Sequence, residues 1–90
     1  MHQHPHQETQ QVLNRISRAA GHLSAIGRMV EEGRDCPDVL IQLAAVRSAI
    51  NSIGRIIITD HMSHCVAEAI EEGDRTALDR FNAALETFLK

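Results

Sequence analysis

The stretch CPDVLIQLAAVRSAINSIGRIIITDHMSHCVAEAIEE, residues 36–72, decides the fold of this 90-residue chain. Its apolar residues recur every three or four positions, as on one face of an α-helix. The series is Val39, Leu40, Leu43, Val46, Ile50, Ile53, Ile57, Met62, Val66 and Ile70. The pattern predicts a helix of about 55 Å over 36–72, too long for a small globule to cover. We therefore expect it to pack against another chain.

Two shorter helices are predicted on either side of the long one. Residues 8–32 keep an apolar spacing of three to four, and Gly33 supplies the stop. Asp74 is suited to cap a third helix, whose apolar stripe we expect to cover a neighbour in the assembly. The stripe consists of Leu78, Phe81, Leu85 and Phe88. Gly54, inside the long helix, allows a bend or a close helix crossing. The predicted fold class is an all-α, three-helix protomer with a long central helix.

Residues 1–8 lack apolar periodicity, and we interpret them as a mobile arm that carries His2, His4 and His6. Together with the helices, the arm is expected to belong to one domain over 1–90. A chain this short buries only about 60 to 65% of its unfolded surface when it folds alone. This too favours partner chains.

The net charge of −3 argues against a protein that coats nucleic acid through bulk basicity. The charge is uneven, because residues 1–56 carry six arginines against five acidic residues, whereas 57–90 carry three basic against seven acidic residues. An anion-binding surface is therefore expected in the first half. Without a run of about 18 apolar residues or a signal peptide, we expect a cytoplasmic protein with no membrane segment. The chain also lacks a phosphate-binding loop and a catalytic triad, so neither an enzyme nor a small-molecule substrate is expected.

His61 and Cys65 form a candidate metal half-site. Four residues apart on a helix, an imidazole and a thiolate project from one face and can reach one ion. The other thiol, Cys36, is 29 residues earlier, which is roughly 43 Å along the same helix. Either the two thiols are unrelated, or two chains meet head to tail and Cys36 of one chain completes the site of the other.

The second alternative agrees with the predicted topology. A short turn at 33–35 makes the first two helices antiparallel, which places the arm near His61 and Cys65 of its own chain and Cys36 at the opposite pole. A two-fold dimer then builds two identical sites, in which Cys36 of one protomer meets His61, Cys65 and a histidine such as His4 of the other. We predict a site of two sulfur and two nitrogen donors.

Motifs along almost the whole chain resemble those of a known family. They are Arg15-x-x-Arg18-x-x-Gly21-His22, the single Cys36, Gln42-Leu43-Ala44-Ala45-Val46-Arg47, Asp60-His61-x-x-x-Cys65-Val66 and the ending Phe88-Leu89-Lys90. The frame is similar to that of the CsoR/RcnR family of bacterial metal-sensing transcriptional repressors. The resemblance implies an all-helical homodimer that assembles into a dimer of dimers, a homotetramer, with metal bound between subunits at the long second helix.

The resemblance also bears on the metal. Members differ at four positions, occupied here by His4, Cys36, His61 and Cys65. This set is similar to that of nickel-sensing members, and two thiolates with two imidazoles suit square-planar Ni(II). The expected function is a repressor that binds operator DNA when metal-free and dissociates on binding Ni(II) or Co(II), which derepresses efflux genes.

Copper-sensing relatives share three of these ligands, Cys36, His61 and Cys65, as a trigonal site for Cu(I). They usually carry a Tyr just before the first Cys and a Glu in the last helix. This chain has Asp35, and Arg80 or Phe81, at those places. Cu(I) remains the alternative, together with a thiol or persulfide sensor that uses the two cysteines, or a metal buffer without a DNA role.

Operator binding is implied by the resemblance, because no helix-turn-helix is recognisable. Arg15 and Arg18 match the family's basic positions on the first helix, and Arg47 and Arg55 are weaker candidates on the second. Arginine suits bidentate contacts with phosphates or guanines.

Overall fold

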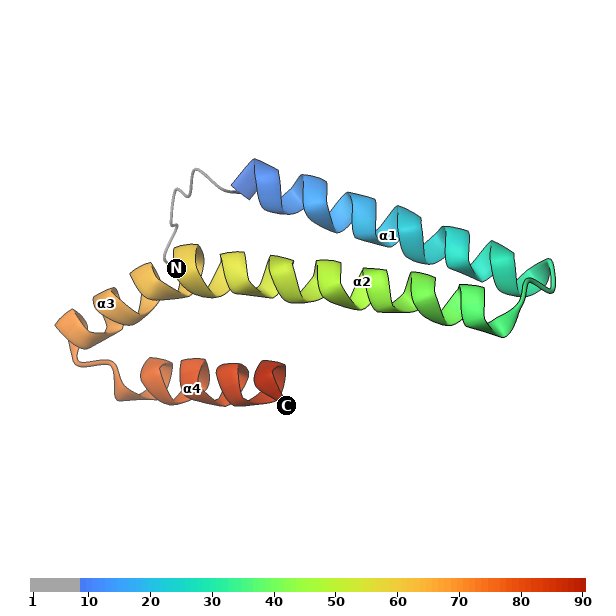
Figure 1. Cartoon of the computed structure of the whole chain (residues 1–90). Helices are drawn as coiled ribbons and strands as arrows, with labels where there is room; N and C mark the ends of the chain where they lie inside the picture. The colour runs from blue at the N-terminus through green and yellow to red at the C-terminus, as the bar shows by residue number, and fades with distance from the viewer. Residues whose placement is uncertain (1–8) are drawn as a thin grey trace. The chain divides into compact units, whose positions relative to one another are not determined.

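The computed structural model describes residues 9–90, which form helices joined by two short turns (Figure 1). In order, the elements are α1 (Thr9–Glu31), α2 (Cys36–Ile56), the π-helical segment η1 (Ile57–Met62), α3 (Ser63–Glu72) and α4 (Arg75–Leu89). No strand occurs in this part of the chain. The all-α prediction is confirmed, and the predicted helix bounds are close to those observed.

Both turns begin at a glycine with a left-handed backbone, Gly33 with φ of 72° and Gly73 with φ of 68°. At each turn, two amides bond back to carbonyls of the last helical turn, in the pattern of a Schellman motif. The bonds are Gly33 N to Val30 O (3.1 Å), Arg34 N to Met29 O (3.0 Å), Gly73 N to Ile70 O (3.2 Å) and Asp74 N to Ala69 O (2.9 Å). The predicted stop at Gly33 is therefore confirmed, and Gly73 ends the long helical stretch in the same way, because glycine adopts this backbone without strain.

Asp74 caps α4 as predicted. Its carboxylate Oδ1 accepts a hydrogen bond from the backbone N–H of Ala77 at 3.1 Å. The bond satisfies one of the amides that a helix start leaves without a partner.

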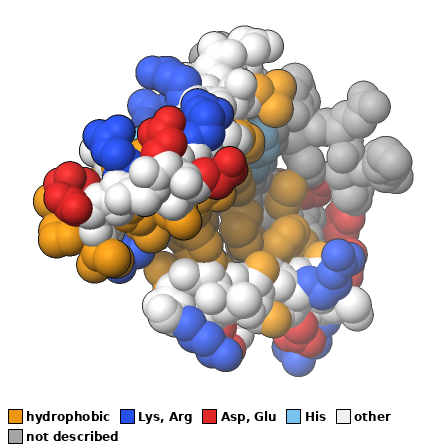
Figure 2. Space-filling model, turned by 90° about the vertical axis from the view of Figure 1, so that its right-hand side faces the viewer, with side chains coloured by type: hydrophobic (Ala, Val, Ile, Leu, Met, Phe, Trp, Pro, Cys, Tyr) orange, Lys and Arg blue, Asp and Glu red, His pale blue; other side chains and the backbone are white. Residues whose placement is uncertain are grey.

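The hairpin unit, residues Thr9–Ile53, contains α1 and most of α2, which run antiparallel beside each other (Figure 1). Its buried core consists of four branched apolar side chains: Val12, Ile26, Val46 and Ile53. Many other large apolar side chains of the unit are exposed, among them Leu13, Ile16, Leu23, Val30, Leu40, Ile41 and Ile50. Hydrophobic side chains lie uncovered among charged ones in Figure 2. Exposed apolar surface of this kind fits a chain that packs against others.

The C-terminal unit, residues Gly54–Lys90, contains the end of α2, η1, α3 and α4. Here α4 turns back after Gly73 and packs against α3 of its own chain. The Phe88 ring lies over Gly54, where a Cβ atom would overlap it. The apolar stripe of α4 thus covers part of its own chain, whereas the sequence predicts that it covers a neighbour. Gly54 is a point of close helix approach, as expected.

The long helix departs from the prediction at η1, because residues 36–72 are not α-helical throughout. Four consecutive β-branched residues, 56–59, lead into this segment, and their side chains crowd the neighbouring turns of an α-helix. The Thr59 hydroxyl also bonds to backbone carbonyls, which competes with regular helix formation.

Read as one helix of 37 residues, Cys36–Glu72 is long and apolar enough to cross a membrane by length and composition. That is weak evidence, because the core helix of a soluble protein can pass the same test.

Candidate metal centre and arginine surface

His61 and Cys65 lie on consecutive turns of the C-terminal unit, His61 in η1 and Cys65 in α3. Both side chains are half-buried, so each is reachable while its orientation is restricted by neighbours. The His61 Nε2 atom lies 3.6 Å from the Asp60 Oδ2 atom. The imidazole and the thiol of the predicted half-site thus lie four residues apart on one continuous helical stretch, and their role as metal ligands stays a prediction.

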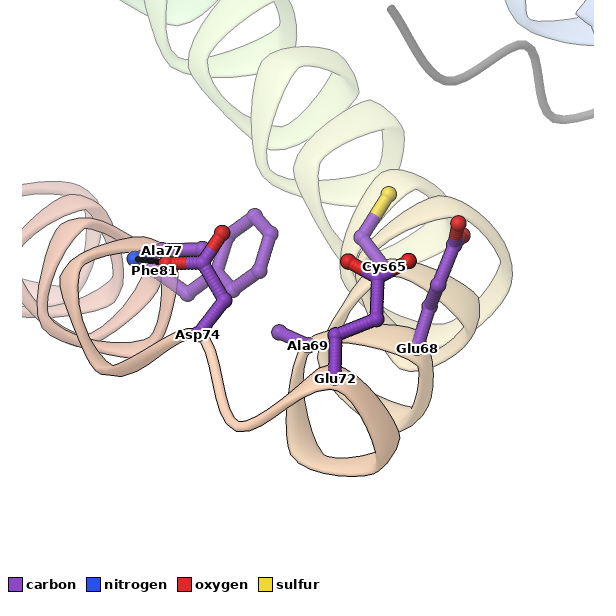
Figure 3. A pocket seen from close by; sticks show the side chains of 7 residues that line it. All are labelled: Cys65, Glu68, Ala69, Glu72, Asp74, Ala77 and Phe81. Atoms are coloured by element: carbon purple, nitrogen blue, oxygen red, sulfur yellow. Dashed lines mark hydrogen bonds between the residues drawn. The ribbon is translucent and has the colours of Figure 1, made fainter.

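A cavity of about 270 Å³ lies beside Cys65, between α3 and α4. Figure 3 shows the Cys65 side chain with those of Glu68 and Glu72 on α3, across from the Phe81 ring on α4. The remaining lining residues are Ala69, Asp74 and Ala77. The thiol thus sits at an opening lined by apolar side chains and by three carboxylates, those of Glu68, Glu72 and Asp74. The sequence reasoning missed Glu68 and Glu72, although their spacing of three and seven residues from Cys65 places them on the same helix face.

Cys36 is the first residue of α2, and its side chain is exposed. Neither cysteine of the chain forms a disulfide. Over residues 9–90 of a single chain, no group of three His, Cys, Asp or Glu side chains is placed to hold a metal ion. The described part of one chain therefore does not contain a complete metal site, and the predicted site would need donors besides His61 and Cys65.

The other predicted nitrogen donor, His4, lies outside the described residues, as do His2 and His6. The predicted role of residues 1–8 as a mobile arm falls on the same segment.

The four arginines proposed for DNA contact lie on two helices. Arg15 and Arg18 are three residues apart on α1, and Arg47 and Arg55 are both on α2. Arg18, Arg47 and Arg55 are exposed. Arg15 is half-buried, and its Nε atom is buried without a hydrogen-bond partner among the residues described. A buried N–H group without an acceptor is unusual, because most buried polar groups in folded proteins form a hydrogen bond.

The family of the chain follows from comparison with known proteins. A model of the family described as metal-sensitive transcriptional repressor matches residues 8–87. The chain belongs to this family of metal-sensing repressors, as its motifs indicate.

Curated relatives give closer comparisons. The chain is 42% identical over 67 residues to the copper-sensing transcriptional repressor CsoR of Bacillus subtilis, a match that covers 74% of this chain and 66% of that protein. It is 44% identical over 71 residues to the copper-sensing transcriptional repressor RicR of Mycobacterium tuberculosis, covering 76% of this chain and 74% of the relative. The chain thus spans about two thirds to three quarters of the length of these two relatives.

Two solved structures match over nearly the whole chain. The copper-sensing repressor CsoR of Geobacillus thermodenitrificans, solved with Cu(I), has a TM-score of 0.85 and 31% identity, covering 100% of this chain and 95% of that chain. The nickel-responsive transcriptional regulator InrS has a TM-score of 0.73 and 42% identity, and the match covers 97% of this chain and 99% of that chain. The fold is therefore shared with a copper-sensing repressor and with a nickel-responsive regulator.

Proposed function

We propose that the chain is a cytoplasmic, nickel-responsive transcriptional repressor that binds operator DNA when metal-free and releases it when Ni(II) or Co(II) binds. Release would derepress genes for metal efflux. The observation that carries this proposal is the pair His61 and Cys65, half-buried on consecutive helical turns in a member of a metal-sensing repressor family.

The donor set fits a soft or borderline metal ion. Thiolate and imidazole are the ligands that nickel, copper and zinc sites in proteins use. His61 and Cys65 would supply one donor of each kind, and Cys36, exposed at the start of α2, would supply the second thiolate from a second protomer. The ion would then cross-link two chains, so homodimers, and tetramers made from them, are part of the proposal.

Nickel is the first candidate metal because the sequence offers His4 as a fourth donor beside Cys36, His61 and Cys65. Four-coordinate Ni(II) accepts two nitrogens and two sulfurs in a square plane, and His4 would supply the second nitrogen. The nickel-responsive InrS is 42% identical over almost the full length of both chains. The full-length match to the Geobacillus copper sensor has 31% identity.

Cu(I) is the second candidate, and specific observations favour it. Cys36, His61 and Cys65 complete a trigonal site without His4, and all three belong to the described residues. The two curated relatives above are copper sensors, and the structure with Cu(I) has a TM-score of 0.85.

DNA contact would be made by Arg15 and Arg18 of α1, with Arg47 and Arg55 of α2 in supporting roles. Arg18, Arg47 and Arg55 are exposed, which suits residues whose guanidinium groups contact phosphate oxygens. Because the chain carries a net charge of −3, such binding depends on this local group of arginines.

The proposal is tested with purified protein and DNA from upstream of its own gene. We expect a gel shift with metal-free protein that disappears when stoichiometric Ni(II) is added anaerobically, and ligand-field absorption bands of square-planar nickel. Closed-shell Cu(I) has no such bands. Release by Cu(I) alone would favour the second candidate. Metal binding with no DNA binding in either state would instead indicate a metal buffer, and release by persulfides alone would indicate a thiol sensor.

A further inference from the structure

The segment η1 departs from α geometry where His61 is placed. In a π-helix, each N–H bonds to the carbonyl five residues earlier, instead of four, so the turn holds more residues than an α turn. Such segments are rare, and they occur frequently at functional sites. His61 is the fifth residue of η1, and Cys65 is the third residue of α3 that follows. The two predicted ligands therefore lie on opposite sides of the junction between π and α geometry.

The junction is bridged by a side-chain hydrogen bond with π spacing. The Ser63 hydroxyl donates to the Ile58 carbonyl, five residues earlier, at 3.3 Å. Serine and threonine in α-helices usually bond back three or four residues, as the Thr87 hydroxyl does to the Ala83 carbonyl at 2.9 Å in α4. The five-residue spacing therefore belongs to the π turn.

The position of Ser63 gives the bond a structural role. Ser63 is the first residue of α3, where the backbone returns from five-residue to four-residue bonding. A carbonyl oxygen has two lone pairs, so the Ile58 carbonyl can accept from the Ser63 hydroxyl in addition to a backbone N–H. The hydroxyl thus adds a second bond across the last turn of π geometry.

A second hydroxyl lies near the beginning of the segment. The Thr59 Oγ1 atom donates to the carbonyls of Arg55 and Ile56, at 3.0 and 3.2 Å. These carbonyls belong to the last two residues of α2, where the backbone hydrogen bonding changes from four-residue to five-residue spacing. Hydroxyl groups thus bond to the backbone at both ends of η1, but only the Ser63 bond has the five-residue spacing of the π turn.

We infer that Ser63 is a positioning residue for the metal site, because its hydroxyl bonds across five residues, helps to hold η1 in its π form and so sets the direction of His61 relative to Cys65. The inference rests on the proposed function. A π turn rotates less per residue than an α turn, so a change of η1 to α geometry would turn His61 about the helix axis relative to Cys65. Groups that orient metal ligands in this way typically contribute 10- to 100-fold in metal affinity.

The test compares Ser63→Ala with Ser63→Thr, which keeps the hydroxyl, and with Thr87→Val, which removes a hydroxyl bond of α spacing. Ni(II) and Cu(I) affinities are measured by competition with a chromophoric chelator, together with the thiolate-to-metal absorption band. We expect Ser63→Ala to lose about 10-fold in affinity, the low end for an orienting group, and to shift the band. Ser63→Thr should bind as wild type does, and Thr87→Val should leave both readouts unchanged.

A readout without metal completes the design. In metal-free protein, amide hydrogen exchange over residues 57–63 should be faster in Ser63→Ala than in wild type. Ser63→Val, which removes the hydroxyl but fills its space, should change affinity and exchange in the same direction, and it serves if Ser63→Ala fails to fold. Wild-type affinity in both variants, while wild type itself binds metal, would overturn the positioning role alone. A wild-type protein that binds neither metal would overturn the proposed function and the positioning role together.

Discussion

The imidazole of His22 and the carboxamide of Gln42 form a hydrogen bond of 2.7 Å between Nε2 and Oε1, and it joins α1 to α2 within the hairpin unit. The two residues are 20 positions apart and partly buried. The bond therefore fixes how one helix is placed along the other, at a level between the buried Val12 and Ile26 on α1.

We expect His22→Ala and Gln42→Ala each to destabilise the protein by about 1 kcal/mol, because a partly buried group loses its partner. The double variant should cost less than the sum of the two, since both changes remove the same bond. The measurement is urea unfolding at fixed protein concentration, because oligomers gain apparent stability with concentration. Gln10→Ala, which removes an exposed bond to Asn14 within α1, is the control and should change stability by less than about 0.5 kcal/mol. Strictly additive effects of His22→Ala and Gln42→Ala would contradict the pairing.

A second prediction concerns the contact of Phe88 with Gly54. A Cβ at residue 54 would overlap the Phe88 ring, so Gly54→Ala should displace α4 and lower stability. At Gly27 in α1, nothing lies within 4 Å of an added Cβ, so Gly27→Ala should stabilise by about 0.5 to 1 kcal/mol through helix propensity. Opposite signs of the two changes in thermal unfolding are the expected result. Phe88→Ala should remove the penalty of Gly54→Ala, and an unchanged penalty would show that the ring is not its cause.

Much of the fold could be predicted because its signals are local. Gly33 and Gly73 stop helices through their own backbone, and Asp74 caps α4 through a residue three positions away. The π turn at 57–62 could not be predicted, because the apolar periodicity of the long helix continues through it. The packing of α4 on its own chain depends on contacts distant in sequence, such as Phe88 with Gly54. The complete metal site stays a prediction, because its proposed donor Cys36 would come from another chain and His4 lies outside the described residues.

The third prediction tests whether the metal site lies between subunits. Cys36→Ala and Cys65→Ala should each abolish tight metal binding, because one thiolate leaves too few soft donors. Co-refolded mixtures of the two variants should regain one intact site per heterodimer, where Cys36 of one chain meets Cys65 of the other. Titration with Cu(I) against a chromophoric chelator counts the sites. Mixtures that recover no binding would rule out the antiparallel dimer.

The fourth prediction separates the two candidate metals. His4→Ala should weaken Ni(II) binding much more than Cu(I) binding, because four-coordinate nickel needs a second nitrogen, whereas Cys36, His61 and Cys65 suffice for Cu(I). His2→Ala and His6→Ala are matched controls on the same segment and should have smaller effects. Affinities come from competition titrations under anaerobic conditions. Equal losses for the two metals in His4→Ala, or no loss for nickel, would contradict a ligand role for His4.

The last prediction concerns the link between metal and DNA. Contacts with phosphates release counterions, so the logarithm of DNA affinity falls with the logarithm of salt concentration by about 0.9 per contact. Arg15→Ala and Arg18→Ala should each flatten this slope by about one contact. Arg34→Ala is the charge-matched control, because Arg34 lies in the turn after α1 and its guanidinium is 3.9 Å from the Glu32 carboxylate. It should leave the slope unchanged.

Metal and DNA must affect each other equally. If metal weakens operator binding by roughly 1 to 3 kcal/mol, the usual range for coupled sites, then operator DNA must weaken metal binding by the same amount. Arg15→Ala should weaken DNA binding in the metal-free and metal-bound states, whereas His4→Ala should reduce the difference between these states. Fluorescence anisotropy with labelled operator, with and without Ni(II), measures both quantities. Equal operator affinity of the metal-free and metal-saturated wild-type protein would refute the repressor mechanism and favour a role in metal buffering.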